Sequence, residues 1–278
     1  MDEPSERLAI AEAPKLVIYG HAAFDVSVVS GKTIRTLGGA AYYAAVGAAK
    51  VIRRVGVVTV IGADFPVEEL RLLEIDLLGV AAREGSSAVF YQEYDSEGTV
   101  RRFESHLNVC EDLSPQLIPT SYLEAQIFFV ATAPPGQQAS VLDGLKRACF
   151  RGLVAIDTAL PYIAEFQGLL RHFAGQIRIA LVNGEEYRAL DWVPPDTVTL
   201  VVKHGPRGAN LRLAGVWVEV PAPRVETVRN TTGAGDILAG AFLAGVASGD
   251  DPRTALVKGV DLATKSVAGF GVERLRAT

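Results

Sequence analysis

The chain has few cysteines, no long uninterrupted apolar run and no basic stripe. Its 278 residues include two cysteines, Cys110 and Cys149, which are too few for a disulfide framework and are not spaced like zinc ligands. Each apolar run is broken by charged or turn residues before it reaches the length of a membrane span. Acids and bases are interspersed, with a net charge of −5, so nothing predicts binding to nucleic acid or to a membrane. We therefore expect a cytoplasmic protein that binds small molecules at local sites.

The length and composition predict one compact unit. With 49% hydrophobic residues, the chain can bury most of its unfolded surface in one core. Residues 1–14 are mixed in charge and contain no continuous apolar segment, unlike a signal peptide. We expect residues 1–14 to form a disordered leader and residues 15–278 to form a single domain.

Short β-branched runs alternate with helical patterns along the chain, which is typical of an α/β protein with a mostly parallel sheet covered by helices. The expected strands are Lys15–Gly20, Val55–Ile61, Ala125–Ala131, Leu153–Asp157, Ile177–Asn183 and Val198–His204. The expected helices are Ala40–Ile52, Gln137–Phe150, Ile163–His172, Asp236–Ser248 and Pro252–Gly269.

Two segments break this rhythm and predict hairpins. The first is Val26–Leu37, turning at Ser30-Gly31-Lys32, and the second is Ala88–Ser105, turning at Asp95-Ser96-Glu97-Gly98. Their alternation suits a sheet with one solvated face. An antiparallel extension of the main sheet's edge is one interpretation of the two hairpins.

The stretch Asn230-Thr231-Thr232-Gly233-Ala234-Gly235-Asp236 opens directly into an apolar helical run. Its small residues let the backbone approach a ligand, and the first N–H groups of a helix lack intrahelical acceptors at the positive end of the dipole. That arrangement suits a phosphate. A carboxylate among such amides is useful when it takes a proton from an attacking hydroxyl. The alternative is an ordinary helix cap in which the dipole favours Asp236.

Four segments resemble the motifs of the ribokinase-like (PfkB) carbohydrate kinases, in that family's order and over nearly the whole chain. They are Gly38-Gly39 before an Ala-rich run, Asn183-Gly184-Glu185-Glu186, Lys203-His204-Gly205-Pro206-Arg207-Gly208, and Thr232-Gly233-Ala234-Gly235-Asp236. The resemblance implies a three-layer α/β/α fold with a mostly parallel central sheet. It also implies that the hairpins at about 26–37 and 88–105 form a small β lid, which folds over the substrate or pairs with a second subunit in a homodimer.

The resemblance further implies an ATP-dependent kinase that uses Mg²⁺ and transfers the γ-phosphoryl group to a hydroxyl. Asp236 is the expected base, and the amides of Thr232, Gly233, Ala234 and Gly235 are expected to hold the developing charge. Glu186 is the expected metal residue, acting on Mg²⁺ through water. The residues expected to bind the nucleotide are Asn183, Lys203, Gly205, Arg207, Gly208 and Thr232.

Several of these positions also have a plain structural interpretation. Asn183 can be a helix N-cap, Glu185 a first-turn charge that serves the helix dipole, and Arg207 a solvated loop charge. For the acceptor, the spacing of Asp25 matches that of the family's substrate-binding aspartate. A carboxylate suits this role because it can accept hydrogen bonds from two adjacent hydroxyls. Gly38 and Gly39 would let the backbone approach the sugar, or serve helix packing.

The chain departs from the family pattern at two positions. Tyr43 replaces the asparagine that many sugar kinases carry after the diglycine, which argues against ribose or fructose, and Asn230 replaces an aspartate, which argues against a monovalent-cation site. His21, the short first hairpin and Lys203-His204 together resemble the compact inositol kinases and the nucleoside-kinase-like members of the family. We predict myo-inositol or a related cyclitol as the acceptor, because a ring that carries only hydroxyls fits Asp25 and backbone donors without a base-recognition pocket. A nucleoside and a pentose or hexose (phosphate) are the alternatives. A non-catalytic small-molecule sensor is the alternative from another class. A dinucleotide-dependent oxidoreductase is a poor alternative, because it would need Gly-x-Gly-x-x-Gly after the first strand, where residues 20–25 read Gly-His-Ala-Ala-Phe-Asp.

Overall fold

The computed structural model describes residues 13–29, 31–94 and 100–276. Most of the predicted leader and the predicted turn at residues 95–98 lie outside these ranges, as does Ser30 of the first predicted turn. Pro14, at the end of the predicted leader, is buried, and its ring lies against the strand that contains Gly56. No helix within the described ranges is long and apolar enough to cross a membrane.

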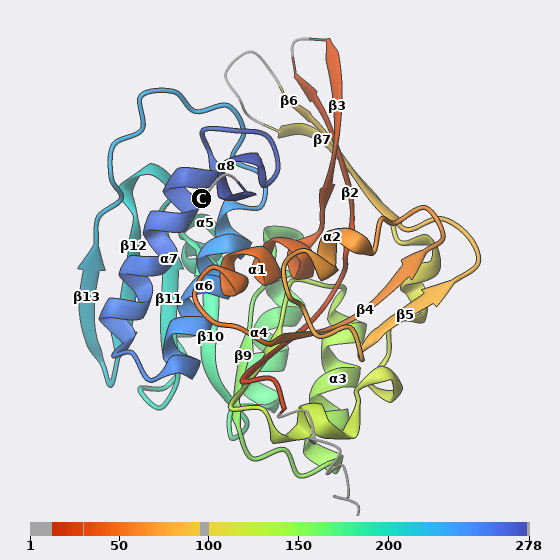
Figure 1. The fold of residues 1–278 in the computed structure, drawn as a ribbon. Coiled ribbons are helices and arrows are strands. Elements are labelled where there is room, and N and C mark those ends of the chain that lie inside the picture. Colours follow the sequence, from red (N-terminus) through yellow and green to blue (C-terminus); the bar gives the residue numbers. More distant parts are fainter. Residues whose placement is uncertain (1–12, 30, 95–99, 277–278) are drawn as a thin grey trace, which may run out of the picture.

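The central sheet has nine strands (Figure 1). They are β1 Leu16–Tyr19, β4 Val55–Gly62, β5 Val80–Arg83, β8 Ile127–Val130, β9 Leu153–Ile156, β10 Ile177–Asn183, β11 Thr199–Lys203, β12 Ala209–Leu213 and β13 Val216–Val220. Their order is β13-β12-β11-β10-β9-β8-β1-β4-β5, parallel except for the antiparallel pairs β11–β12 and β12–β13. All six predicted strands are present, whereas β5 and the β12–β13 hairpin were not predicted.

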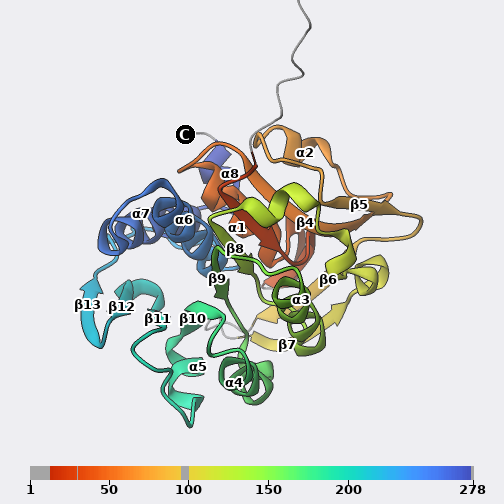
Figure 2. The same ribbon diagram turned by 90° about the horizontal axis from the view of Figure 1, so that it is seen from below.

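Helices cover both faces of this sheet, which confirms the three-layer α/β/α arrangement. The helices are α1 Ala40–Ala49, α2 Glu68–Arg71, α3 Pro135–Arg147, α4 Ile163–His172, α5 Gly184–Ala189, α6 Ala234–Ser248, α7 Pro252–Ser266 and α8 Glu273–Arg276. Figure 2 shows α1, α6 and α7 on one face and α3, α4 and α5 on the other. β1 is buried on both faces: Leu16 and Ile18 belong to the core under α1 and α6, and Val17 and Tyr19 to the core under α3 and α4.

Helices α1 and α6 pack closely because glycines lie at their contact. A Cβ on Gly47 would lie 2.2 Å from the carbonyl oxygen of Ile237, and one on Gly240 would lie 1.9 Å from that of Ala44. Real Cβ atoms do not approach backbone so closely, so small residues here set the distance between the helices. This contact places Tyr43 of α1 beside the start of α6.

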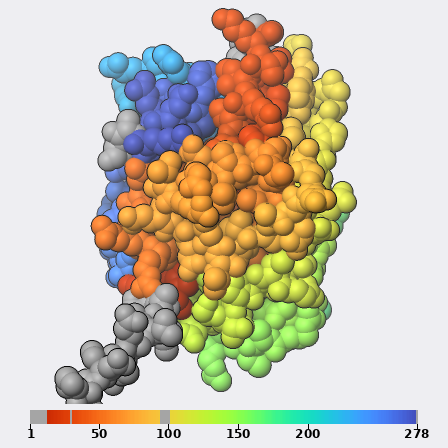
Figure 3. All heavy atoms as spheres, turned by 45° about the vertical axis from the view of Figure 1, so that its right-hand side comes forward, coloured from red at the N-terminus to blue at the C-terminus, as the bar shows by residue number. Residues whose placement is uncertain are grey.

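A second sheet of four strands forms the lid, in the order β3-β2-β6-β7. Its strands are β2 Ala23–Val29, β3 Lys32–Gly38, β6 Ala88–Tyr94 and β7 Val100–His106. The predicted hairpins are confirmed, and β2 and β6 join them through a parallel pair. The lid is therefore a separate sheet and does not extend the edge of the main one. In Figure 3, β2 and β3 (red-orange) and β6 and β7 (yellow) adjoin at the top of the molecule, beside the C-terminal segments in blue.

Candidate active site

The first turn of α6 forms the centre of the candidate site. The helix begins at Ala234, two residues earlier than predicted, and its N-cap Gly233 has φ 77°, a left-handed conformation that favours glycine. A Cβ on Gly233 would also lie 2.4 Å from the ring of Tyr43. Both constraints favour glycine at this position, so the ring of Tyr43 packs directly against the backbone of the turn.

Three backbone N–H groups of this turn are available to an anion. Within the described residues, the N–H groups of Gly233, Gly235 and Asp236 have no hydrogen-bond acceptor. By contrast, the N–H of Thr232 donates to Oδ1 of Asn230 at 2.6 Å, and that of Ala234 donates to the carbonyl of Thr231 at 3.2 Å. The amides that are free to bind an anion thus differ from the predicted set: that of Asp236 is open, and those of Thr232 and Ala234 are already engaged.

Asp236 carries a perturbed carboxyl group in this turn. Burial raises its pKa to about 8, although the ammonium of Lys203 opposes the rise, and the carboxylates of Asp157, Asp25 and Glu186 add to it. A base works best when its pKa lies near the operating pH. With its pKa near 8, Asp236 is ionised and able to accept a proton in a growing fraction of molecules as the pH rises through 8.

Lys203, the last residue of β11, extends along the same turn. A Cβ on Gly235 would lie 3.6 Å from both Cδ and Nζ of Lys203, so the ammonium lies against the anion-binding amides. Its Nζ donates a 2.6 Å hydrogen bond to Oδ2 of Asp157, which follows β9 and is fully buried. Burial lowers the pKa of Lys203, but the carboxylates of Asp157, Glu186 and Asp236 outweigh this effect and raise it overall. The ammonium is thus kept charged beside the site.

Asn183 and Glu186 form a complete capping box at the start of α5. Oδ1 of Asn183 accepts from the N–H groups of Glu185 and Glu186, and both carboxylate oxygens of Glu186 accept from the N–H and Nδ2 of Asn183 at 2.6 Å. The structural interpretation of Asn183 as an N-cap therefore holds, and its polar groups are engaged. Glu185 is exposed in the first turn, as a dipole charge would be.

Glu186 fits Mg²⁺ as a residue that acts through water. It is buried, and burial raises its pKa to about 7 despite the opposing charge of Lys203. Across the described ranges, no group of three or more His, Cys, Asp or Glu is placed to hold a metal. Mg²⁺ does not require one, because it keeps several waters and commonly binds one or two carboxylates plus substrate phosphates. The charge of Glu186 interacts with that of Lys203, so Glu186 lies beside the ammonium of the candidate site.

The loop after β11 holds the other predicted nucleotide-binding residues. Gly205 and Arg207 lie in a 3₁₀ turn, and Arg207 is exposed. Gly208 has φ 97°, and a Cβ there would lie 2.0 Å from the carbonyl oxygen of Val220. The glycine at position 208 is thus explained by its approach to β13. A nucleotide contact for these residues stays a prediction.

Asp25, Gly38, Gly39 and Tyr43 form a second cluster at the base of the lid. Asp25 lies inside β2 and not in a loop after the first strand, and it is 4% exposed. Its Oδ2 accepts a 2.8 Å hydrogen bond from the phenol of Tyr43. Burial raises the pKa of Asp25 to about 6, which hydrogen bonds from Tyr43 and from the N–H of Gly39 oppose. Tyr43, which stands where many family members carry an asparagine, therefore donates a hydrogen bond to the carboxylate that is expected to hold the acceptor.

The diglycine makes room for this carboxylate. A Cβ on Gly38 would lie 2.3 Å from Cγ and Oδ2 of Asp25, and one on Gly39, where φ is 86°, would lie 2.4 Å from the carbonyl oxygen of His21. Glycine is needed here because the backbone approaches Asp25 and the chain beside it. The predicted contact of this backbone with a sugar stays a prediction.

The inner face of the lid carries polar and aromatic groups beside Asp25. In the register of β2 and β6, Asp25 pairs with Phe90, so both side chains lie on one face. Phe90 stacks with Phe103, with ring centroids 6.4 Å apart and planes 12° apart, and Phe103 is 51% exposed. On the same face, Oγ1 of Thr232 donates a 3.4 Å hydrogen bond to Oε1 of Gln92. The lid and the start of α6 thus face a shared space.

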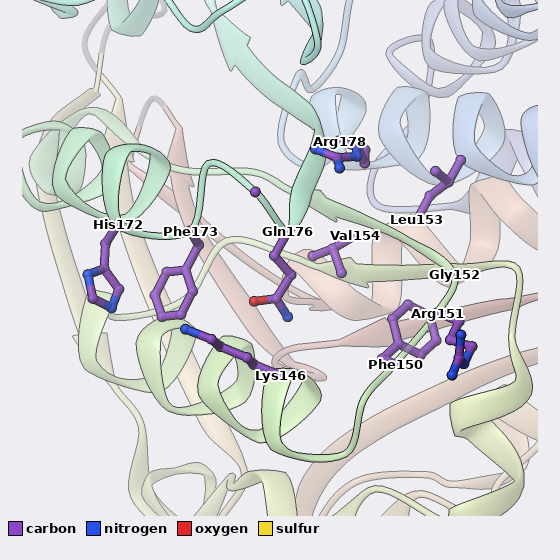
Figure 4. A pocket seen from close by; sticks show the side chains of 11 residues that line it. Lys146, Phe150, Arg151, Gly152, Leu153, Val154, His172, Phe173, Gln176 and Arg178 are labelled. Carbon is purple, nitrogen blue, oxygen red and sulfur yellow. The ribbon is translucent and has the colours of Figure 1, made fainter.

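Two surface hollows lie outside this centre. One, of about 520 Å³, lies where β9 and β10 begin, lined by residues such as Lys146, Phe173 and Gln176 (Figure 4). The strands of the candidate site end at the opposite edge of the sheet, so this hollow is not part of it. The other, of about 660 Å³, is lined by Pro223, Arg229, Lys265 and neighbouring residues. It borders the segment that leads into the turn at Gly233.

A parallel sheet with a lid, a carboxylate in a helix start with open N–H groups and a second carboxylate under the lid fit a small-molecule kinase. The chain matches the pfkB family carbohydrate kinases over residues 13–275, and it belongs to this family. It is an ATP-dependent carbohydrate or nucleoside kinase, a phosphotransferase that acts on a hydroxyl group.

Three relatives are similar to this chain over nearly its whole length. Cytidine kinase of Thermococcus kodakarensis is 29% identical over 277 residues, covering 92% of this chain and 97% of the relative. The nucleoside kinase of Burkholderia thailandensis, solved with inosine, superposes with a TM-score of 0.80 at 18% identity, covering 92% of this chain and 90% of the other. The nucleoside kinase of Methanocaldococcus jannaschii gives 0.79 at 20% identity, covering 96% and 100%. The two structures establish the fold.

Sequence reasoning missed Asp157 and the lid phenylalanines. Asp157 directly follows the apolar run Leu153–Ile156, and an acid at the carboxyl end of a parallel strand is a signal for a site residue. Phe90 and Phe103 lie in the segment predicted as a hairpin, but the sequence does not tell which face of the hairpin is covered.

Proposed function

We propose that this kinase phosphorylates a hydroxyl on the sugar of a nucleoside, with Mg-ATP as donor. The observation that carries the proposal is the stacked pair Phe90–Phe103 on the same lid face as Asp25. Asp25 offers an acceptor-only carboxylate to sugar hydroxyls, and an aromatic surface beside it suits a planar base. A cyclitol has no planar aromatic ring that could stack on this surface. The names of the cytidine and nucleoside kinases it resembles support the same choice.

The proposal replaces the cyclitol predicted from the sequence. That prediction assumed that the chain has no base-recognition pocket, whereas Phe103 leaves about half of its surface open on the inner face. None of the relatives named above is an inositol kinase. Pairing of the lid with a second subunit in a homodimer remains a proposal.

The proposed chemistry is a direct in-line transfer. The acceptor hydroxyl, held by Asp25, loses its proton to the carboxylate of Asp236 as its oxygen forms a bond to the γ-phosphorus. The bond from that phosphorus to the bridging oxygen breaks, and ADP leaves. The N–H groups of Gly233 and Gly235 and the ammonium of Lys203 stabilise the charge on the transferred group.

Mg²⁺, when bound, neutralises negative charge on the donor phosphates. Glu186 would hold it through water, from its position beside Lys203 and Asp157. The adenosine of the donor fits the hollow next to residues 223–229, because that segment leads directly into the phosphate-binding turn. Closure of the lid would exclude water as a competing acceptor.

An acceptor panel tests the proposal. ADP release is measured with Mg-ATP and cytidine, inosine, adenosine, ribose, fructose or myo-inositol, for the wild type and for Phe103→Ala. We expect turnover on a nucleoside, with KM for that nucleoside raised about tenfold or more by loss of one stacking contact. The control is Phe24→Leu, on the opposite face of the lid, where Phe24 packs on Phe65. Turnover confined to myo-inositol or to a free sugar would contradict the proposal.

A further inference from the structure

Asp157 is a buried carboxylate to which the proposed chemistry gives no direct part. It is 0% exposed, and it lies where β9 ends at the edge of the sheet that carries the site. Its Oδ1 accepts a 2.8 Å hydrogen bond from the N–H of Thr158, and its Oδ2 accepts from Nζ of Lys203 at 2.6 Å. One oxygen is therefore fixed by backbone, and the other is directed at the ammonium.

Several carboxylates lie close enough to Lys203 to interact with its ammonium. Its ammonium acts on Asp157 after β9, on Glu186 in α5 and on Asp236 in α6. The other charged or titratable groups that act on Asp236 are Asp25 of β2 and the phenol of Tyr43 on α1. A lysine has a flexible stem and can turn toward any partner within reach. What fixes it here is the short, charge-assisted bond to a carboxylate that is itself held in place.

The position of the ammonium matters for the two groups that face the substrate. Bound to Asp157, it lies along Gly235, next to the amides that would receive the transferred phosphoryl group. Bound to Asp236 instead, it would occupy the oxygens that must accept the proton of the acceptor hydroxyl. Such a pair would stabilise the charged form of Asp236 and weaken it as a base.

We propose that Asp157 is a positioning residue that holds Lys203 on the phosphate side of the site and so keeps Asp236 free to act as the base. The inference rests on the proposed phosphoryl transfer with Asp236 as base. Asp157 itself touches neither acceptor nor donor in this scheme, and it acts through Lys203.

The test compares Asp157→Asn, Lys203→Met and the double variant with the wild type, using the nucleoside that gives turnover. Lys203→Met removes a phosphate contact, for which we expect a loss in kcat of about 10²-fold. Because Asp157 acts through Lys203, adding Asp157→Asn to Lys203→Met should change kcat by less than about threefold, which is the non-additivity of groups that act as a unit. A further loss of tenfold or more in the double variant would show that Asp157 has a role of its own, for example toward the metal.

The pH dependence of kcat/KM gives an independent readout. In Asp157→Asn, Lys203 is released toward Asp236 and a neighbouring negative charge is lost, and both changes lower the pKa of Asp236. The acid limb should therefore move to lower pH by about one unit or more while kcat falls. In Lys203→Met the same limb should move to higher pH. The inference would be overturned if the acid limb of kcat/KM stayed in place in Asp157→Asn and Lys203→Met, or if it moved in the same direction in both.

Folding and the proposed function are checked separately. Each variant is compared by circular dichroism and by ATP binding. In Lys203→Met, the unpaired carboxyl of Asp157 can take up a proton and become neutral. The comparison of Lys203→Met with the double variant therefore holds even if Asp157→Asn alone does not fold. Asp236→Asn distinguishes the two failures: if it keeps wild-type turnover, the proposed function fails, whereas if it is inactive and the Asp157 and Lys203 effects simply add, this inference alone fails.

Discussion

Replacing Tyr43 with phenylalanine removes the hydrogen bond that the phenol donates to Asp25 at 2.8 Å and leaves the ring in place. Burial raises the pKa of Asp25 to about 6, and the bond from Tyr43 holds it from rising further. A hydrogen bond to a charged group contributes about 1.5–3 kcal/mol, which corresponds to about one to two pH units. In Tyr43→Phe, the carboxyl should therefore ionise at a pH about one to two units higher than in the wild type.

The consequence for acceptor binding depends on pH. The ionised carboxylate accepts hydrogen bonds from both hydroxyls of the sugar, whereas the neutral form must donate one of its own. At pH 7 the ionised fraction of Asp25 should fall from most of the molecules to between roughly a half and a tenth. We expect acceptor affinity to fall by about two- to tenfold at pH 7 and to recover by pH 9.

Calorimetric titration of the acceptor between pH 5.5 and pH 9 measures this directly. The titration uses Asp236→Asn as background, because that variant neither turns over nor contributes the titration of Asp236. The matched control is Tyr42→Phe, on the same helix, whose phenol accepts from Arg276 at 3.2 Å. A pH-independent loss in Tyr43→Phe, or the same pH dependence in both phenylalanine variants, would refute this account of Asp25.

Three further outcomes are expected. Gly38→Ala should reduce acceptor affinity by tenfold or more in calorimetry, because its Cβ would lie 2.3 Å from the carboxylate of Asp25, whereas Gly136→Ala, with nothing within 4 Å, should not. Without nucleotide or Mg²⁺, Asp236→Asn should melt higher than the wild type at pH 9, since the native carboxyl ionises only near pH 8. A difference of 1 kcal/mol in stability corresponds to about 2–4 °C. Scanning calorimetry should show the difference in melting temperature shrinking as the pH falls from 8 toward 4, because the wild-type carboxyl then becomes neutral in both the native and the unfolded state. Gly240→Ala should lower the melting temperature in scanning calorimetry, because its Cβ would lie 1.9 Å from the carbonyl oxygen of Ala44 and force α6 away from α1.

The layered fold and the segments that meet at the candidate site could be predicted because they depend on local patterns. The apolar strands, the helical periodicities and the turn at Gly233 each lie within one short stretch of sequence. The diglycine was also found, but its contact was not: the sequence places Gly38 near the lid and gives no sign that the carboxylate of Asp25 lies against it.

What the sequence could not predict depends on register and on long-range contacts. The pairing of β2 with β6 decides that Phe90 shares a face with Asp25, and two hairpins read separately do not contain this information. The bond between Asp157 and Lys203 joins residues 46 positions apart, on strands that are not adjacent in the sheet. The amides of Thr232 and Ala234 were expected to be open, but Asn230 and the local turn occupy them.

The central claim is that Asp236 is the base of an ATP-dependent transfer to a nucleoside. Its most direct test is single-turnover formation of the nucleoside phosphate by wild type and Asp236→Asn, with Mg-ATP binding measured in parallel. We expect the variant to bind Mg-ATP about as well as the wild type and to lose about 10²–10⁴-fold in the rate of transfer. A variant that transfers the phosphoryl group at the wild-type rate would contradict the account.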